Sequence, residues 1–230
     1  MLLMKLKFIL LFLMLAITFS CQHQKPDNSL FTLYHQAYKT LQNDDFKEAS
    51  EKFEQIQESF PFSPWAVKAK TMAAYAYYRA NEKAKTLQIA QDFLQAHSDS
   101  QYAVYMLYLQ GLCYHEKIPN IYRSQEDTFE SANIFLQLIA QYPNSIYIDD
   151  AKEKLEFAYE HLTASKMAIG RYQIKNNNFV GAIGNFQSVI NDYPQTSQTA
   201  EAYSRLAEIY LKLGLEKQSW QILYFSKQGL

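Results

Sequence analysis

The sequence predicts an all-α fold, an α-solenoid of about five helix–turn–helix units with about ten helices in total. The first observation behind this prediction is a short phrase that occurs three times, as "FPFS" at 60–63, "YPNS" at 142–145 and "YPQT" at 193–196. The second is that each phrase ends a stretch whose apolar residues follow a helical spacing. Because the same turn closes similar helices, the chain is predicted to repeat one structural unit.

The beginning of the chain predicts export from the cytoplasm. Two lysines precede an uncharged apolar run of about 12 residues, which is shorter than the roughly 20 that cross a bilayer. Ser20 directly before Cys21 resembles the end of a bacterial lipoprotein signal peptide, and Gln22 then implies sorting to the outer membrane. We therefore expect residues 1–20 to be the signal peptide and Cys21 to carry a covalent lipid. An ordinary signal peptide or an uncleaved anchor is the alternative.

The segment after this signal is short and polar. Residues 21–29 contain one proline and are predicted to be a lipidated tether. The only other cysteine, Cys113, lies in an apolar segment and is expected to be a buried side chain without a disulfide partner. The chain has 22 basic and 23 acidic residues and no basic stripe, which excludes nucleic acid as an expected partner.

The second helix of each unit is predicted from an apolar face in which a small residue precedes an aromatic residue by four positions. A neighbouring helix can then approach closely at the small residue and be covered by the ring. Proline follows and ends the helix, because it has no N–H to donate and restricts the residue before it. The first and last copies of this face are Phe46, Ala49, Phe53, Ile56, Phe60 and Phe179, Ala182, Phe186, Val189, Tyr193.

The first helix of each unit is predicted from apolar segments rich in tyrosine and small residues, at 32–41, 70–80, 105–116, 164–175 and 203–214. Two helices in roughly 34 residues is the period of tetratricopeptide (TPR) repeats. Small residues recur twelve positions before the small residue of the second helix, where the two helices must cross: Ala37, Ala74, Gly170 and Ala207.

The third unit departs from this regularity. The distance from Gly111 to Ser131 is 20 residues instead of 12, so a loop at 116–128 is predicted to be inserted. A further helix is expected at 148–162, ahead of the separate helix at 164–175. We divide the repeats into N-terminal units at residues 30–143 and C-terminal units at residues 144–230.

The concave face of the N-terminal units is predicted to be an aromatic groove that binds an extended peptide. Tyrosine suits this task because it offers a large apolar ring with a hydrogen-bonding tip at low entropic cost. The interpretation left open is that these rings belong to the core between repeats. The candidate groove residues are Phe31, Tyr34, Tyr38, Tyr75, Tyr78, Arg79, Tyr105 and Tyr108.

The same helix positions in the C-terminal units are charged, which favours docking of a folded partner. These candidate docking residues are Arg171, Lys175, Glu201, Glu208 and Lys212.

Catalysis finds no support in the sequence. The five histidines are scattered, and "HEKIP" at 115–119 has a proline where a zinc-protease helix needs its second histidine. No nucleophile elbow, phosphate loop or dinucleotide fingerprint occurs. We therefore expect no enzyme, no metal site and no cofactor apart from the lipid on Cys21.

The chain resembles the BamD (ComL) lipoproteins of the outer-membrane β-barrel assembly (BAM) machine over about residues 30 to 215. The segments that carry the resemblance are "FPFSPW" at 60–65, "AYAYYRANE" at 74–82, "YAVYM" at 102–106, "QGLCY" at 110–114 and "YPNSIY" at 142–147. In the inserted loop, Arg123 and Asp127 match an Arg/Asp-rich segment of the family.

The resemblance implies a lipoprotein on the periplasmic side of the outer membrane of a Gram-negative bacterium. Its implied partners are a BamA-like barrel-assembly protein with periplasmic POTRA domains, other BAM lipoproteins, and unfolded outer-membrane protein precursors. It implies a scaffold and substrate receptor in the insertion of β-barrel proteins. The alternative is another periplasmic TPR lipoprotein, one that coordinates cell-wall synthesis or pilus biogenesis.

Overall fold

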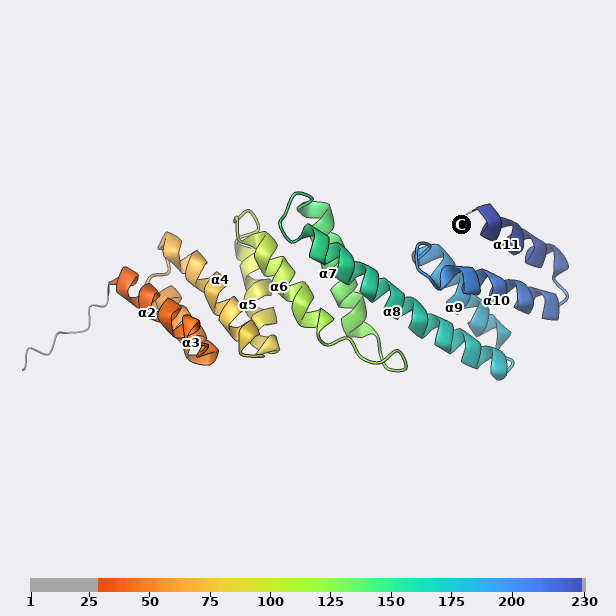
Figure 1. Ribbon diagram of the computed structural model, residues 1–230, viewed down its shortest axis with the longest axis horizontal. Coiled ribbons are helices and arrows are strands. Elements are labelled where there is room, and N and C mark those ends of the chain that lie inside the picture. Colours follow the sequence, from red (N-terminus) through yellow and green to blue (C-terminus); the bar gives the residue numbers. More distant parts are fainter. Residues whose placement is uncertain (1–28, 229–230) are drawn as a thin grey trace, which may run out of the picture.

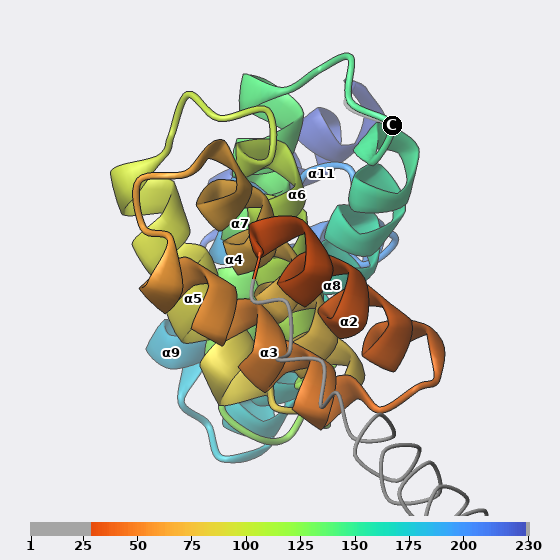
Figure 2. The same cartoon turned by 90° about the vertical axis from the view of Figure 1, so that its left-hand side faces the viewer.

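Ten helices, α2 to α11, form antiparallel pairs that stack side by side along one long axis (Figure 1). They lie within residues 29–228, the part of the chain that the computed structural model describes, and that part contains no strand. The helices are α2 (Leu30–Gln42), α3 (Phe46–Ser59), α4 (Pro64–Arg79), α5 (Lys83–Ala96), α6 (Ala103–His115), α7 (Glu126–Gln141), α8 (Ile148–Lys175), α9 (Phe179–Asp192), α10 (Thr199–Lys212) and α11 (Glu216–Gln228). The predicted all-α, TPR-like solenoid is confirmed. Seen from the α2 end, α2 and α3 lie in front of the later helices (Figure 2).

The three copies of the repeated phrase and the turn at 97–100 form the same hydrogen-bonded turn between units. The N–H of its fourth residue donates to the carbonyl of its first residue at 3.0–3.2 Å, in the pairs Ser63–Phe60, Ser100–His97, Ser145–Tyr142 and Thr196–Tyr193. The Oγ atom of each of the three serines also accepts the N–H two residues further on, which supports the start of the next helix. The turn at 97–100 keeps this bond although it lacks the proline.

The turns inside four of the units share a backbone conformation. Each places one residue in the left-handed region, with φ values of 64° for Asp44, 61° for Asn81, 56° for Asn177 and 72° for Gly214. Asp, Asn and Gly are the residues that adopt this conformation most readily. The short connections between paired helices therefore follow from the residue types at these positions.

The helices of a unit cross where the sequence places small residues. A Cβ atom added to Gly111 would lie 2.8 Å from the ring of Phe135, and one added to Gly170 would lie 2.7 Å from the ring of Phe186. Both rings are fully buried. The predicted close crossing of paired helices at small residues is therefore confirmed at Gly111 and Gly170.

The expectation of two separate helices at 148–162 and 164–175 is wrong. Helix α8 runs without a break through both segments and contains 28 residues. The sequence around the expected break has no proline, and the Thr163 hydroxyl donates to the carbonyls of Tyr159 and Glu160 within the helix. The first part of α8 packs against α7 and its last part against α9, so α8 connects the two halves of the solenoid (Figure 1).

The inserted loop packs against this long helix. The structure places it at residues 116–125, because α7 already begins at Glu126. The carbonyl of Pro119 lies 2.6 Å from Nε2 of His161, and the Ser165 hydroxyl donates to the carbonyl of Ile121 at 2.7 Å. The loop is thereby attached to the middle of α8.

The hydrophobic core is a row of local clusters, one for each set of neighbouring helices. Four of these clusters contain a fully buried phenylalanine: Phe53, Phe93, Phe135 and Phe186. Cys113 is buried as predicted, and burial raises the pKa of its thiol to about 11. Among the described helices, none has the length and hydropathy that a membrane crossing requires.

Candidate functional site

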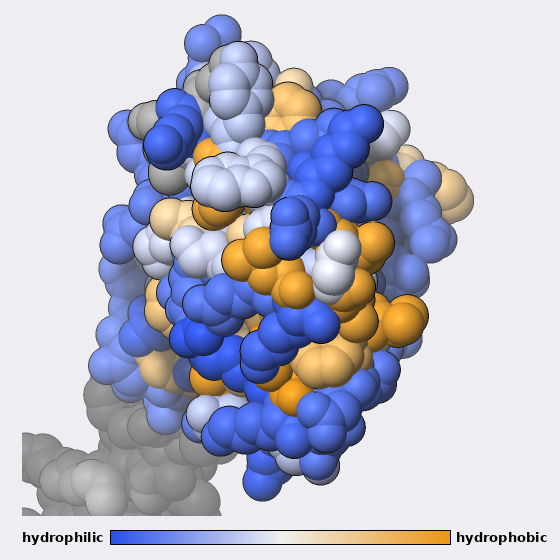
Figure 3. Space-filling view, turned by 90° about the vertical axis from the view of Figure 1, so that its right-hand side faces the viewer, coloured by the Kyte–Doolittle hydropathy of each residue, from blue (hydrophilic) through white to orange (hydrophobic). Residues whose placement is uncertain are grey.

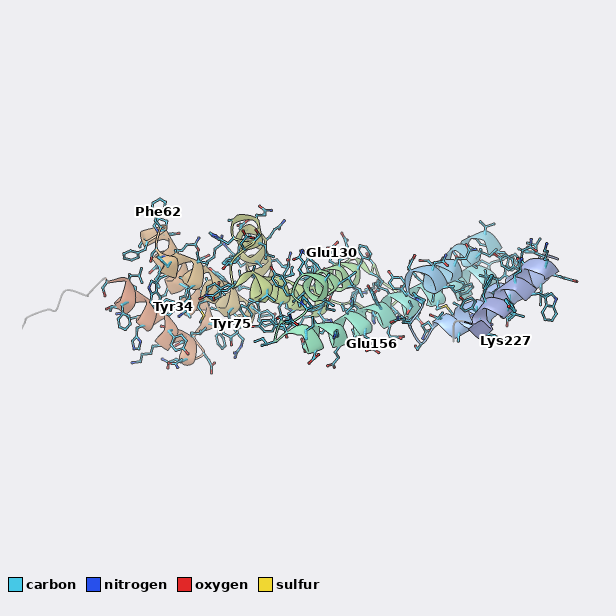
Figure 4. All side chains as sticks on the ribbon, turned by 90° about the horizontal axis from the view of Figure 1, so that it is seen from above. Tyr34, Phe62, Tyr75, Glu130, Glu156 and Lys227 are labelled. Carbon is cyan, nitrogen blue, oxygen red and sulfur yellow. The ribbon has the colours of Figure 1, made fainter. Side chains whose placement is uncertain are left out.

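An open groove of about 930 Å³ lies between α4, α6 and the turn that joins α7 to α8. Five tyrosines line it: Tyr75, Tyr102, Tyr105, Tyr142 and Tyr147. We call this surface the aromatic groove. A smaller hollow of about 310 Å³ adjoins it, because the two share Met72 and Tyr75. Figure 4 shows Tyr34 and Tyr75 in this N-terminal half of the solenoid.

One wall of the aromatic groove is the turn that contains "YPNS". The ring of Tyr147 stacks on Tyr108 with the ring centroids 4.5 Å apart, and it lies 5.7 Å from the ring of Tyr105. The Tyr108 hydroxyl donates to Oδ2 of Asp150 at 2.7 Å, which attaches α6 to the start of α8. These contacts hold the turn against α6.

Four of the eight predicted groove residues line the two hollows. Tyr75 and Tyr105 line the aromatic groove, while Tyr38, Tyr75 and Arg79 line the smaller hollow.

The other four predicted groove residues lie outside both hollows. Tyr34 packs edge-on against Phe53 and Trp65. Phe31 is 70% exposed. Tyr78 donates to Glu116, and Tyr108 supports Tyr147. The alternative that some of these rings pack between helices therefore applies to Tyr34 and Tyr108.

Tyr102, Tyr142 and Tyr147 line the aromatic groove but were not among the predicted groove residues. From the sequence, "YPNS" at 142–145 predicts only the end of a helix, whereas Tyr142, Ser145 and the following Tyr147 all line the aromatic groove. The available signal was the pair of tyrosines that flanks this copy of the turn in "YPNSIY".

Two tyrosines of the aromatic groove, Tyr105 and Tyr147, have a raised pKa. Burial raises the pKa of Tyr105, and the nearby Tyr147 hydroxyl contributes to the same shift. Burial also raises the pKa of Tyr147, and it raises the pKa of Tyr34 to about 12. The groove therefore offers rings and uncharged hydrogen-bonding groups.

The two loop residues singled out by the sequence lie at the surface near α7. Arg123 is exposed, and its backbone N–H donates to the carbonyl of Asn120. Asp127 lies in the first turn of α7, where a negative charge is favourable to the helix dipole. No ion pair involves either side chain within residues 29–228.

The charged residues of the C-terminal units bind mainly to each other. Arg171 on α8 contacts Glu201 on α10 at 3.2 Å, and Arg205 contacts Glu201 at 3.2 Å and Glu208 at 3.1 Å. Three of the five predicted docking residues thus take part in ion pairs within the chain. Lys175 and Lys212 make no ion pair in the described part of the protein.

A second apolar surface lies on the last described helix. Trp220, Tyr224 and Phe225 on α11 are 69%, 60% and 54% exposed and line a hollow of about 630 Å³. Figure 3 shows this end of the solenoid, where hydrophobic residues in orange lie between hydrophilic residues in blue. We call these three residues the α11 face. The α11 face was not predicted from the sequence.

The stacked helix pairs define a TPR-like repeat protein, a class with extended surfaces that bind other molecules. Among residues 29–228, no group of three or more His, Cys, Asp or Glu side chains is arranged to hold a metal ion.

The chain belongs to the YfiO family of outer membrane lipoproteins, whose sequence model matches residues 26–222. The resemblance to BamD lipoproteins is confirmed by two relatives with the name outer membrane protein assembly factor BamD. The relative from Caulobacter vibrioides is 33% identical over 187 residues, which are 81% of this chain and 61% of that protein. The relative from Rickettsia prowazekii is 31% identical over 203 residues, which are 86% of this chain and 81% of that protein.

Two solved structures of helical repeats are also similar. A tetratricopeptide repeat protein from Parabacteroides merdae is 14% identical with a TM-score of 0.42, and the match covers 87% of this chain and 79% of that chain. The TPR-like repeats of a putative kinesin light chain from Podosopora anserina are 13% identical with a TM-score of 0.44 in a variant structure, and the match covers 90% and 97% of the two chains.

Proposed function

We propose that this protein is an outer-membrane protein assembly factor that acts as a scaffold and as a receptor for unfolded β-barrel precursors. The observation that carries the proposal is an aromatic groove on a TPR-like solenoid in a member of this lipoprotein family. The alternative, a scaffold for cell-wall synthesis or pilus biogenesis, is disfavoured because both relatives described above are assembly factors.

The aromatic groove is the proposed receptor site. Membrane β-strands carry apolar side chains on alternate positions, so one face of an extended precursor can place its rings against Tyr75, Tyr105 and Tyr147. Each aromatic pair contributes about 0.5–1.5 kcal/mol beyond the area that it buries. Contacts of this size suit transient capture of a precursor that must be released for insertion.

The C-terminal end is the proposed docking site for a folded partner. The α11 face presents three exposed aromatic side chains, and aromatic residues are enriched among the hot spots of protein interfaces. Lys175 and Lys212 add positive charge that no acidic group of the described chain neutralises within an ion pair. The proposed occupant is the periplasmic POTRA region of a BamA-like barrel-assembly protein, with other BAM lipoproteins in the same complex.

The proposed anchor is a lipid on Cys21, which lies outside the described residues together with most of the tether. A lipid there would hold the solenoid against the periplasmic side of the outer membrane. We propose no catalytic activity, no cofactor besides this lipid and no nucleic-acid partner. The Cys21→Ala variant is expected to leave the outer-membrane fraction, and unchanged fractionation would refute the anchor.

Affinity purification from detergent-solubilised outer membranes tests the identity of the partners. We expect recovery of a large barrel protein with repeated periplasmic domains. Recovery of peptidoglycan enzymes alone would reject the proposed function.

Crosslinking to precursor segments tests the receptor site. The paired substitutions Tyr75→Ala and Tyr105→Ala should reduce crosslinking about tenfold, because both rings line the aromatic groove. Tyr122→Ala is the matched control, since this tyrosine is 81% exposed on the inserted loop. Equal crosslinking by the paired variant and the control would reject the groove as the receptor site.

A further inference from the structure

The lining of the aromatic groove carries no charge. Every residue that lines it within residues 29–228 is apolar, aromatic, a hydroxyl-bearing residue or an amide. Its polar side chains include Gln101, Gln141 and Asn144, and it has no Lys, Arg, Asp, Glu or His. A carboxylate placed there would lose hydration without gaining an ionic partner, which disfavours binding.

One cation at the edge of the site, Arg79, is already engaged by other groups. Arg79 lines the smaller hollow, where its Nη1 donates to the Tyr75 hydroxyl at 2.7 Å. Its guanidinium also lies over the ring of Phe46 at 4.3 Å and 3.9 Å from Asp44. Arg79 therefore completes a wall and is not presented as a free carboxylate receptor.

Lys68 is a second cation of α4. Its Nζ lies 5.0 Å from the centroids of both Tyr34 and Trp65, and it lines neither hollow. The cation–π contacts hold this charge over rings outside the aromatic groove.

The amide side chains suit a polypeptide backbone. Each amide has both donor and acceptor atoms, as a peptide group has. Gln101 and Asn144 make no side-chain hydrogen bond within the described protein, while Gln141 accepts only a long one from Gln137 at 3.4 Å. They lie on different walls, since Gln101 precedes α6 and Asn144 lies in the turn before α8. An extended segment between these walls can bond to both.

From these observations we propose that the aromatic groove binds an uncharged, aromatic-rich interior segment of an extended polypeptide and does not recognise a chain-terminal carboxylate. This inference depends on the proposed receptor function, because it specifies which feature of a precursor the aromatic groove binds. The rings supply affinity, and the amides align the backbone. A segment can therefore bind whether or not it ends the chain.

Peptide binding to the purified mature protein tests this inference. Two fluorescent peptides have the same sequence of about ten residues with aromatic side chains at alternate positions, and they end in a free carboxylate or in an amide. We expect dissociation constants that agree within about twofold, measured by fluorescence anisotropy. A third peptide with Asp in place of the central aromatic residue should bind at least about tenfold more weakly.

A variant of the protein that gains affinity for a carboxylate provides the matched test. Asn144 is exposed in the turn, so Asn144→Lys places a cation in the lining with little effect on packing. We expect this variant to bind the free-acid peptide at least about threefold more tightly than the amide, and Asn144→Gln to show no preference.

The outcomes separate this inference from the receptor function itself. Binding of the free acid by the unmodified protein about tenfold or more above the amide would overturn the inference and leave the receptor function intact. Absence of any binding that depends on Tyr75 and Tyr105 would overturn the receptor function. Circular dichroism of each variant confirms that the helices are intact.

Discussion

The two halves of the solenoid share one architecture but present different surfaces. In α2–α7 the aromatic groove is lined by five tyrosines, and its described lining contains no charged side chain. In α8–α11 several charged side chains form ion pairs with each other, and three exposed aromatic residues lie on α11. The repeated helix pairs therefore determine the architecture that the halves share, while residues outside the helix crossings determine what each half can bind.

The largest expected effect is on stability, and it tests whether the two halves depend equally on the buried phenylalanine of their own core clusters. Phe53→Ala and Phe186→Ala should each lower the free energy of unfolding by about 3–5 kcal/mol, because both rings are fully buried. Urea unfolding followed by circular dichroism measures this. The controls Phe62→Ala and Val180→Ala remove exposed side chains and should change stability by less than about 0.5 kcal/mol. A small effect at Phe186 alone would mean that the halves differ in their cores as well.

The second prediction concerns the α11 face. Trp220→Ala combined with Tyr224→Ala should reduce recovery of the folded partner about tenfold or more, because exposed aromatic residues are frequent hot spots of binding. Co-purification with quantitative immunoblotting measures it. Peptide binding in the aromatic groove should not change. Phe31→Ala with Phe62→Ala, at the other end of the solenoid, is the control. Undiminished recovery would place the docking surface elsewhere.

The third prediction is that the protein loses stability at high pH because Tyr34, in the N-terminal half, loses its proton. Burial raises the pKa of Tyr34 to about 12, whereas an unfolded tyrosine has a pKa of about 10. The folded state therefore holds the Tyr34 proton more tightly than the unfolded state does. The resulting contribution to the free energy of unfolding is complete below pH 10 and is lost as the pH rises from 10 to 12. Urea midpoints across this range measure it. Tyr34→Phe should show a shallower decline, and an identical decline would exclude Tyr34 as a source.

The smallest expected effect tests the ion pairs of the C-terminal half. Glu201→Gln removes the contacts to Arg171 and Arg205, whose side chains are about 40% exposed. Solvent and salt screen such pairs, so the free energy of unfolding should fall by less than about 1 kcal/mol. Lys175→Gln is the unpaired control and should have no effect on stability. A loss above about 2 kcal/mol would show that these charges stabilise the junction of α8 with α10 and are not mainly a surface feature.

Particular residues show where the sequence was sufficient. The apolar spacing from Phe46 to Phe60 and the small residue at Gly111 predicted a helix face and a helix crossing that the structure contains. The break expected between residues 162 and 164 was wrong, because a count of repeats suggested a turn for which the local residues provide no signal. The groove was predicted in part, since Tyr75 and Tyr105 line it but Tyr78 and Tyr108 bind acidic side chains instead.

Apart from the continuous α8, the sequence by itself determined the helices, their paired crossings and the turns between units. These features depend on hydrogen bonds between residues a few positions apart and on the helical spacing of apolar side chains, both of which are visible in a single sequence. The family was likewise predicted from short segments of the chain.

Only the tertiary structure decided which side chains form the walls of the groove. The contact of Tyr108 with Asp150 joins residues 42 positions apart, and Tyr147 reaches α6 only after the chain has passed through α7. The superhelical arrangement of successive units brings such residues together. Because that arrangement comes from the packing of whole helices, local sequence patterns do not specify it.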